Sequence, residues 1–425
     1  MFAVAGLGAR DAVQDLRLDP RIRLVDSPSA ATILLVAGVL PQELGEPLAR
    51  LHDSLPHPRA VVTWTPGAPA TPWLDVLEGR AAAAEGLLAE AVVAVQQDLL
   101  AGRRPSSPPI LPDEDPAPWR GIGPYAQGGT GMTGGTPYGR PMAELGPDRD
   151  GLRLDILPLA VGPFFPRWPA GLALDLRLGG DVVVEVSPPT SPFAAGGFAG
   201  PARPGLAPFL RALREPVPVR ELELARAREH LRWLADALVA CGLRSLGARV
   251  LRLAASLTPD DRDAVAGLRR TLRWTQATRW ATGGVGVLSP ETVQGLGLGP
   301  VARAAGVDED LRSADPAYRD LGFEPAVQGE GDAAARWQQR LAEAEQSLAL
   351  AARAGEARTL PAGQVETPRG RLDADGSATA RLLALLPGLL QGLEWGDAVT
   401  TLVSLDLDFE EGASVAQAVE PALAS

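Results

Sequence analysis

The chain of 425 residues has no lysine, one cysteine and three histidines. The single cysteine, Cys241, excludes an intrachain disulfide and any cysteine-ligated cluster built from this chain alone. None of the histidines (His52, His57 and His230) stands at metal-ligand spacing with a carboxylate or cysteine partner. A Walker phosphate-binding loop is also excluded, because that motif needs a lysine. We therefore expect no metal and no cofactor on this chain.

Long apolar runs and excess positive charge are missing as well. No run approaches the roughly 20 apolar residues that span a bilayer. A formal net charge of −12 argues against general binding of nucleic acid, which needs a basic surface. The first residues, Met1-Phe2-Ala3-Val4, lack the basic region of a secretory signal. With 46% hydrophobic residues the chain can bury more than one core, so we expect a cytoplasmic protein without a membrane span of its own.

Proline- and glycine-rich stretches divide the chain into the parts of an α+β multidomain protein. Residues 103–118 and 188–208 carry most of the prolines that separate patterned segments. We expect an α/β unit at 1–104, a linker and loop at 105–150, a β-hairpin region at 151–200, a helical bundle at 201–355 and a small mixed unit at 356–425.

Periodicity predicts the elements inside these parts. A buried strand at 33–39, a helix at 42–55 and a second strand at 60–64 indicate a parallel βαβ unit. Apolar residues at helical spacing predict helices at 81–101, from 220 to Gly242, and at 333–354. Thr258 followed by proline and two aspartates indicates another helix start. The apolar run at 400–407 predicts a strand.

The central feature is a strand at 154–161, a corner and a hairpin. The corner reads Gly-Pro-Phe-Phe-Pro-Arg-Trp-Pro from Gly162, so it presents Phe164, Phe165, Arg167 and Trp168. Residues 172–178 and 182–186 alternate around Gly-Gly-Asp, which is typical of a hairpin turn.

This corner, hairpin and Val-Val-Glu-Val return resemble the opening of the D subunit of respiratory NADH–quinone oxidoreductase (complex I). The large subunits of energy-converting [NiFe] hydrogenases are similar. Downstream positions follow the family's order and spacing: Thr282, Gly283, Gly284, Val285, Gly286, Val287, Gly299, Pro300, Arg303, Gly306, Asp310, Leu311, Arg312, Tyr318, Gly331, Asp332, Arg336, Arg340, Glu343, Gln346, Ser347, Val365, Glu366, Pro368, Arg369 and Gly370. The resemblance covers most of 151–410 and implies a bundle of the hydrogenase large-subunit type.

Residues 1–104 look like the complex I B subunit, or hydrogenase small subunit, without its metal ligands. Where those relatives carry a cluster cysteine after the second strand, this chain has Thr65-Pro66-Gly67. The paired Cys-x-x-Cys motifs that hold nickel and iron in the hydrogenases are absent too. The resemblance therefore implies a fused small-plus-large module of a peripheral arm that lacks its own metal centres.

Departures from the family pattern bear on the chemistry of the corner. Both histidines that the complex I subunit carries there are missing, and a phenyl ring cannot deliver a proton to a reduced carbonyl. Arg167 is too basic to act as a proton donor. We expect the corner to be packed shut or used for docking, without quinone reduction.

Other candidate residues have plain structural alternatives. Arg303, Asp310, Arg312, Asp332 and Arg336 could form a polar network between bundle segments, and buried Arg–Asp pairs mostly orient structure. The pattern around His230 suggests a solvated helix face, and that around Cys241 a buried thiol. Gly6-Leu7-Gly8 is half of a dinucleotide fingerprint and more typical of a turn. The loop at 128–135 could cradle a phosphate or serve structure and docking.

The resemblance implies two functions that the sequence leaves open. One is a peripheral-arm subunit of a complex I-like or energy-converting-hydrogenase-like membrane oxidoreductase, on the cytoplasmic face of the inner membrane. Its partners would be the other subunits of that assembly, including integral membrane subunits. The alternative is a non-catalytic scaffold that couples to antiporter-like membrane subunits. A free-standing enzyme is disfavoured because no nucleophile–base pair can be assembled.

Overall fold

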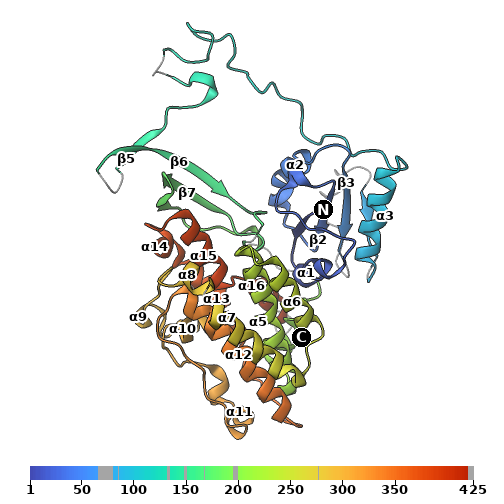
Figure 1. Ribbon diagram of the computed structural model, residues 1–425, viewed down its shortest axis with the longest axis vertical. Coiled ribbons are helices and arrows are strands. Elements are labelled where there is room, and N and C mark those ends of the chain that lie inside the picture. The colour runs from blue at the N-terminus through green and yellow to red at the C-terminus, as the bar shows by residue number, and fades with distance from the viewer. Residues whose placement is uncertain are drawn as a thin grey trace.

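The computed structural model describes residues 1–65, 80–84, 86–131, 135–147, 151–166, 168–194, 200–275 and 277–419. Its N-terminal part is a four-stranded parallel sheet in the order β1-β2-β3-β4 (Figure 1). The strands are β1 (Phe2–Ala5), β2 (Ile33–Ala37), β3 (Ala60–Trp64) and β4 (Ala81–Ala82). The parallel pairing of β2 with β3 across α2 (Gly45–Asp53) confirms the predicted βαβ unit.

The two faces of this sheet lie in different cores. Ile33 and Leu35 pack with α1 (Arg10–Asp15) and α3 (Leu88–Leu100), while Leu34 and Val36 face α2 and a larger core. All five residues of β2 are buried because the strand has neighbours on both edges and both faces. That larger core also holds apolar residues of the corner and of the last helices, so the N-terminal sheet is packed onto the rest of the protein.

The predicted helix at 81–101 is wrong in its first turns. Residues Ala81–Ala82 form β4 beside β3, and the helix begins only at Leu88. Its buried stripe is Leu88, Val92, Val95 and Leu99, whereas Leu87 is exposed. Alanine favours a helix over a strand, so the pairing available at the sheet edge overrode the local preference.

A second sheet is antiparallel, in the order β5-β6-β7-β8. It contains β5 (Glu144–Pro147), β6 (Arg153–Val161), β7 (Leu174–Gly179) and β8 (Val182–Val186), which confirms the predicted strand and hairpin. In Figure 1 this green ribbon lies above the helices, and the chain between α3 and β5 runs outside both bodies. Val183 exchanges backbone hydrogen bonds with Gly392 and Leu393, so the C-terminal segment covers the edge of β8.

Two glycines fix the shape of the corner between β6 and β7. Gly162 has a φ of 99°, and a Cβ there would lie 1.9 Å from the carbonyl oxygen of Leu172. Gly171 has a φ of 85°, and its Cβ would lie 1.7 Å from the ring of Phe193. Both the backbone conformation and the space require glycine, because other residues rarely adopt a positive φ.

Helices form the lower part of the molecule in Figure 1. They are α4 (Ala207–Ala212), α5 (Val219–Ala240), α6 (Arg244–Ala255), α7 (Arg262–Thr275), α8 (Ala277–Thr282), α9 (Pro290–Val293), α10 (Pro300–Ala304), α11 (Pro316–Asp320) and α12 (Ala333–Arg353). Gly242, with a φ of 80°, follows the end of α5 as predicted, and Thr258 forms a capping box with Asp261. Asp332 caps α12 by accepting a hydrogen bond from the Ala335 amide.

The C-terminal segment is mainly helical, and the strand predicted at 400–407 is wrong. It contains β9 (Gln364–Glu366), β10 (Arg371–Asp373), α13 (Ala378–Leu383), α14 (Leu386–Leu390), α15 (Trp395–Leu405) and α16 (Phe409–Val419). Ala398, Leu402 and Leu405 are buried on one face of α15, at spacings of three and four. A short apolar run fits a strand and a buried helix equally well, and packing selected the helix.

None of the described helices is long and apolar enough to cross a membrane. The mixed helix and strand content agrees with the expected α+β class.

Candidate functional site: two linked clusters of buried charge

The corner is only partly buried. Trp168 is 7% exposed and contacts the rings of Phe165 and Trp395, with centroids 5.2 and 5.8 Å away. Phe165 itself is 40% exposed, and Phe164 is half-buried. Arg167, the fourth predicted corner residue, lies outside the described residues. The corner is thus not packed shut. Of the two predicted alternatives, docking is the one that remains open.

A cavity of about 230 Å³ adjoins the corner and connects it to charged residues. Phe164, Phe165 and Trp168 form its apolar side together with β1 and Phe193. Arg10, Asp406, Asp408 and Glu410 line the same cavity. A more open groove of about 640 Å³ shares Phe164 and Phe165 with it and is also lined by Pro47, Leu51 and Leu159. The corner therefore contributes to both a mostly apolar groove and a cavity that charged residues also line.

Arg303, Asp310 and Arg312 come together in the bundle as predicted. Arg303 contacts Asp310 at 2.8 Å, Glu343 at 2.8 Å and Glu366 at 2.9 Å. Arg312 lies 2.8 Å from the same Oδ2 atom of Asp310. Arg303 and Glu343 have no exposed surface, so these are ion pairs of the interior. The network keeps these buried guanidinium groups paired, as the cost of burying charge requires.

Glu223 extends this network toward Tyr318. Its carboxylate accepts hydrogen bonds from the hydroxyls of Ser347 at 2.6 Å and Tyr318 at 2.7 Å, and from Arg312 at 3.2 Å. Burial opposes ionisation, but Arg226 and Arg312 outweigh it and lower the pKa of Glu223. We call Glu223, Arg226, Arg303, Asp310, Arg312, Glu343 and Glu366 the bundle cluster.

Asp332 and Arg336 lie outside the bundle cluster, although the sequence grouped them with it. Asp332 caps α12 and accepts a 2.7 Å hydrogen bond from the Gly284 amide. Arg336 donates to Ser404 at 2.8 Å and to the carbonyl groups of Gly286 and Gly331, both at 2.9 Å. Burial lowers the pKa of Arg336 to about 9. These two residues join α12 to the Gly284–Gly286 segment and to α15, which is a structural role.

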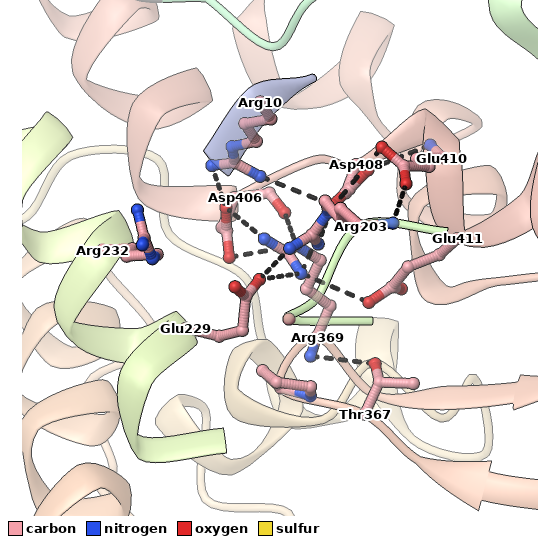
Figure 2. A network of polar contacts seen from close by, with 12 residues as sticks. Arg10, Arg203, Glu229, Arg232, Thr367, Arg369, Asp406, Asp408, Glu410 and Glu411 are labelled. Atoms are coloured by element: carbon pink, nitrogen blue, oxygen red, sulfur yellow. Dashed lines mark hydrogen bonds and ion pairs between the residues drawn. The ribbon is translucent and has the colours of Figure 1, made fainter. Parts of the chain in front are cut away.

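A second cluster, absent from the predicted site residues, lies where the first helix, α1, meets α5 and residues 406–411 (Figure 2). We call it the junction cluster: Arg10, Asp11, Arg203, Glu229, Arg369, Asp406, Asp408, Glu410 and Glu411. Arg203 contacts Asp408 at 2.5 Å, Glu229 at 2.6 Å and Asp11 at 3.4 Å. Figure 2 shows Arg203 and Arg369 at the centre with the carboxylates around them.

Arg369 and Arg10 close the junction cluster on two sides. Arg369 lies 3.1 Å from Asp406 and 3.3 Å from both Glu229 and Glu411. Arg10 contacts Asp406 at 3.1 Å and reaches the cavity, where its side chain is 31% exposed. The cluster thereby ties the first helix to α5 and to the segment before α16.

Backbone amides also hold the junction cluster. Glu410 accepts hydrogen bonds from the amides of Gly8 and Arg203, both at 3.0 Å. Gly6-Leu7-Gly8, considered as half of a dinucleotide fingerprint, thus forms a turn whose amide binds a carboxylate of the same chain. Asp11 accepts from the Gly205 amide at 3.3 Å. These bonds join residues some 200 to 400 positions apart in the chain.

The pKa values in the junction cluster diverge. Burial opposes ionisation of Glu229, but Arg203 and Arg369 lower the pKa of Glu229 to about 2. Burial raises the pKa of Glu411 to about 7, with Asp408 adding to the rise and Arg369 opposing it. Burial likewise raises the pKa of Asp11 and of Glu410. Neighbouring carboxylates with such different pKa values can hold and release protons near neutral pH.

His230 and Arg340 join the two clusters. His230 Nε2 lies 3.4 Å from Glu343 of the bundle cluster, and its Nδ1 atom lies 3.5 Å from Arg340. Arg340 lies 3.3 Å from Asp406 of the junction cluster. Burial lowers the pKa of His230 to about 4, so the ring is neutral at neutral pH. The predicted solvated face for His230 is therefore wrong: the residue is 2% exposed because α5 is packed on all sides.

Cys241 is also placed differently from the prediction. It is exposed at the end of α5, and its thiol has no part in either cluster. In the part of the chain that the structure describes, no three His, Cys, Asp or Glu side chains are arranged to hold a metal ion. Of the loop at 128–135, residues 132–134 lie outside the described part.

The sequence held faint signals of the junction cluster. Residues 406–411 contain four acids, and Arg369 belongs to a motif with family resemblance. Arg203 stands in a proline-glycine stretch that suggested only a loop, yet it is 1% exposed. A single arginine in an otherwise uncharged stretch rich in Pro, Gly and Ala is the local signal that indicates a buried charge here.

Comparison with known proteins gives a family match over part of the helical region. Residues 257–406 match the family model described as respiratory-chain NADH dehydrogenase, 49 kDa subunit. A D subunit of NADH-quinone oxidoreductase from Chloroherpeton thalassium is 45% identical over 85 residues, 19% of this chain and 19% of that protein. The corresponding protein of Desulfotalea psychrophila is 32% identical over 164 residues, 30% of this chain and 44% of the relative. The matches thus span less than half the length of these relatives.

A likeness to a solved structure is looser. A chain of the membrane-bound sulfane sulfur reductase, an archaeal respiratory membrane complex, superposes with a TM-score of 0.47 and 21% identity. The likeness covers 61% of this chain and 98% of that one. At this level it carries no argument about function.

Proposed function

We propose that the chain is a subunit of a complex I-like membrane oxidoreductase, because residues 257–406 match the family model of the 49 kDa subunit of respiratory NADH dehydrogenase. The observation that carries the proposal is the match itself, because it includes Arg303, Asp310 and Arg312 of the bundle cluster. The bundle would then be the hydrogenase large-subunit type of scaffold. Its site would lie on the cytoplasmic face of the membrane, in the peripheral arm.

The N-terminal sheet would make the chain a fused small-plus-large module. Two contacts support this extension: the sheet shares an apolar core with the corner, and Gly8 and Arg10 enter the junction cluster. In such a module both halves would meet at the cavity beside the corner. A cavity between two halves is a common place for a ligand, because polar groups from both sides converge there.

We expect this chain to contribute no nickel and no iron–sulfur cluster of its own. The basis is chemical, since one cysteine cannot supply the thiolates that these centres usually need. Elemental analysis of the purified chain should give iron and nickel far below one atom per chain. Stoichiometric iron or nickel after gel filtration would contradict this expectation.

For the corner we propose docking of a partner and no quinone reduction. Phe164, Phe165 and Trp168 offer apolar area, and none of the three side chains is a proton donor of suitable pKa. A photoreactive quinone analogue should then label the corner weakly and without saturation. Saturable labelling of residues 162–171 would contradict the proposal.

Membrane partners provide the main test. A tagged full-length chain should be recovered from gently solubilised membranes together with integral membrane subunits. Replacing Phe165 with glutamate should reduce this recovery, because the charge would lie in the apolar groove. The matched control is Leu100→Glu, which changes a residue 69% exposed on α3. Recovery of a lone monomer from the soluble fraction, without integral membrane subunits, would contradict the proposal.

The composition of the recovered complex separates the two functions. Flavin and iron–sulfur subunits in the eluate would favour an electron-transferring assembly. Antiporter-like subunits alone would favour the scaffold that couples to them without catalysis. The corner is apolar and lacks the family's histidines, and this observation favours the scaffold as the second candidate function.

A further inference from the structure

We propose that the junction cluster is a proton-binding site, with Glu411 as the buried carboxyl group that holds the proton. The site lies between the N-terminal sheet and the helical part and reaches the cavity beside the corner. The proposal concerns the isolated chain and does not depend on which complex the chain joins. Its ligand is the proton itself.

Charge balance is the first argument. Among the described residues, six carboxyl groups lie around the same arginines: Asp11, Glu229, Asp406, Asp408, Glu410 and Glu411. Four guanidinium groups contact them: Arg10, Arg203, Arg340 and Arg369. Arg232 is paired with Asp15 at 2.8 Å and also attracts Asp11 and Glu229, and even with this fifth guanidinium group the carboxyl groups remain in excess. An excess of buried negative charge is costly, and protonation removes it.

The geometry of Glu411 is the second, independent argument. The residue is 1% exposed, and one oxygen, Oε1, lies 3.3 Å from Arg369. The other oxygen, Oε2, is buried and has no hydrogen-bond partner among the described residues. A buried carboxyl oxygen without a hydrogen-bond partner costs more free energy when the group is ionised than when it is neutral, so this geometry favours the protonated form.

The groups around Glu411 come from several segments. Arg369, from the loop after β9, contacts it directly, and Arg203 attracts it from the segment before α4. The Thr367 hydroxyl also favours the ionised form, although it donates to a backbone carbonyl. Asp408, from the segment before α16, opposes ionisation. Burial, with Asp408, outweighs the other groups and raises the pKa of Glu411 to about 7, which agrees with the geometry.

The junction cluster also extends to the cavity beside the corner. Asp408 and Glu410, close to Glu411 in sequence, line the cavity together with Arg10. Burial and Asp408 also favour the protonated form of Glu410, whose pKa is raised while Arg203 opposes the rise. Asp408 and Glu411 contact the same nitrogen of Arg369, at 3.4 and 3.3 Å, so a proton held at Glu411 lies close to a carboxyl group that lines the cavity. A ligand in the cavity that changes charge would shift the protonation of the whole cluster.

Infrared titration of the full-length chain tests the proposal. The wild type should show a protonated-carboxyl band that disappears with a midpoint near pH 7. Glu411→Gln should remove that band, and the control Glu46→Gln, at an exposed residue of α2, should leave it unchanged. A band that persists in Glu411→Gln, or a wild type without a band at pH 6, would overturn the proposal.

The melting temperature of the same variant decides the case if the spectrum is crowded. Glutamine is isosteric with a protonated glutamate, so Glu411→Gln should fold and melt at or above the wild-type temperature at pH 8. If Glu411 is instead ionised and needed by Arg369, the variant will melt lower or fail to fold at every pH. Either of these outcomes refutes proton binding at Glu411.

Discussion

Replacing Arg203 with methionine removes the guanidinium group at the centre of the junction cluster. Methionine keeps an unbranched apolar side chain, so the change mainly deletes charge. Arg203 is 1% exposed and contacts Asp408, Glu229 and Asp11 within 3.4 Å. Breaking a buried pair by removing one partner costs roughly 3 to 5 kcal/mol. We expect about 3 kcal/mol, the lower end of that range, because Arg369 still contacts Glu229 and Asp408.

Urea unfolding at pH 7 measures this loss as a lower midpoint with an unchanged slope. The control is Arg50→Met, because Arg50 and its partner Glu46 are 71% and 68% exposed. That control should leave the midpoint unchanged within error, since exposed ion pairs contribute little. Both variants remove one positive charge, so a general effect of net charge would appear in both.

The pH dependence of the Arg203→Met effect provides a sharper check. In the wild type the pKa of Glu229 is about 2, below its ordinary value of 4.5. Its contribution to stability is therefore present above pH 4.5 and is lost as the pH falls toward 2. The difference between wild type and variant should shrink over the same window. A loss of less than about 1 kcal/mol at pH 7, or one that does not change with pH, would refute the reasoning.

Three further predictions concern other parts of the two clusters and the corner. Tyr318→Phe removes the hydroxyl that donates to Glu223 at 2.7 Å and should cost roughly 1.5 to 3 kcal/mol in urea unfolding; no loss would mean that Ser347 and the arginines suffice. The pKa of Glu411 is raised from 4.5 to about 7, so its contribution to the free energy of unfolding is present below pH 4.5 and is lost as the pH rises through 7. The loss is at most roughly 3 kcal/mol. Calorimetry should therefore show that the stability of the wild type falls relative to that of Glu411→Gln as the pH rises over this range. Phe165→Ala should lower the free energy of unfolding by less than the roughly 3 to 5 kcal/mol of a fully buried phenylalanine, because the residue is 40% exposed. A larger loss in urea unfolding would show that the corner is more tightly packed than its exposure indicates.

Elements with clear local signals were predicted well. The run at 33–39, the hairpin around Gly179 and Gly180, and the helix that ends before Gly242 all appear at their expected places. In each case a single segment carries its own pattern and turn residue. The errors at 81–84 and 400–407 have tertiary causes, because Ala81 and Ala82 pair with β3 and the residues up to Leu405 pack as part of α15.

Charged residues were harder to place than apolar ones. His230 stands among Arg226, Arg228, Glu229 and Arg232, a pattern that suggests a solvated helix face. The structure buries Arg226, Glu229 and His230 because partners arrive from other segments of the chain. A helix carries no local record of those partners, so its charges look exposed until the tertiary contacts are known.

The sequence by itself determined the match of residues 257–406 to a family model, most helices and strands, and the lack of cysteine ligands. It also brought Arg303, Asp310 and Arg312 into one group, since their spacing follows a family motif. Only the tertiary structure decided that Arg203 meets Glu229 and Asp408, from positions 26 and 205 residues away. The physical reason is that pairing and burial of charge depend on distances in space, and long-range contacts leave no periodic trace in the chain.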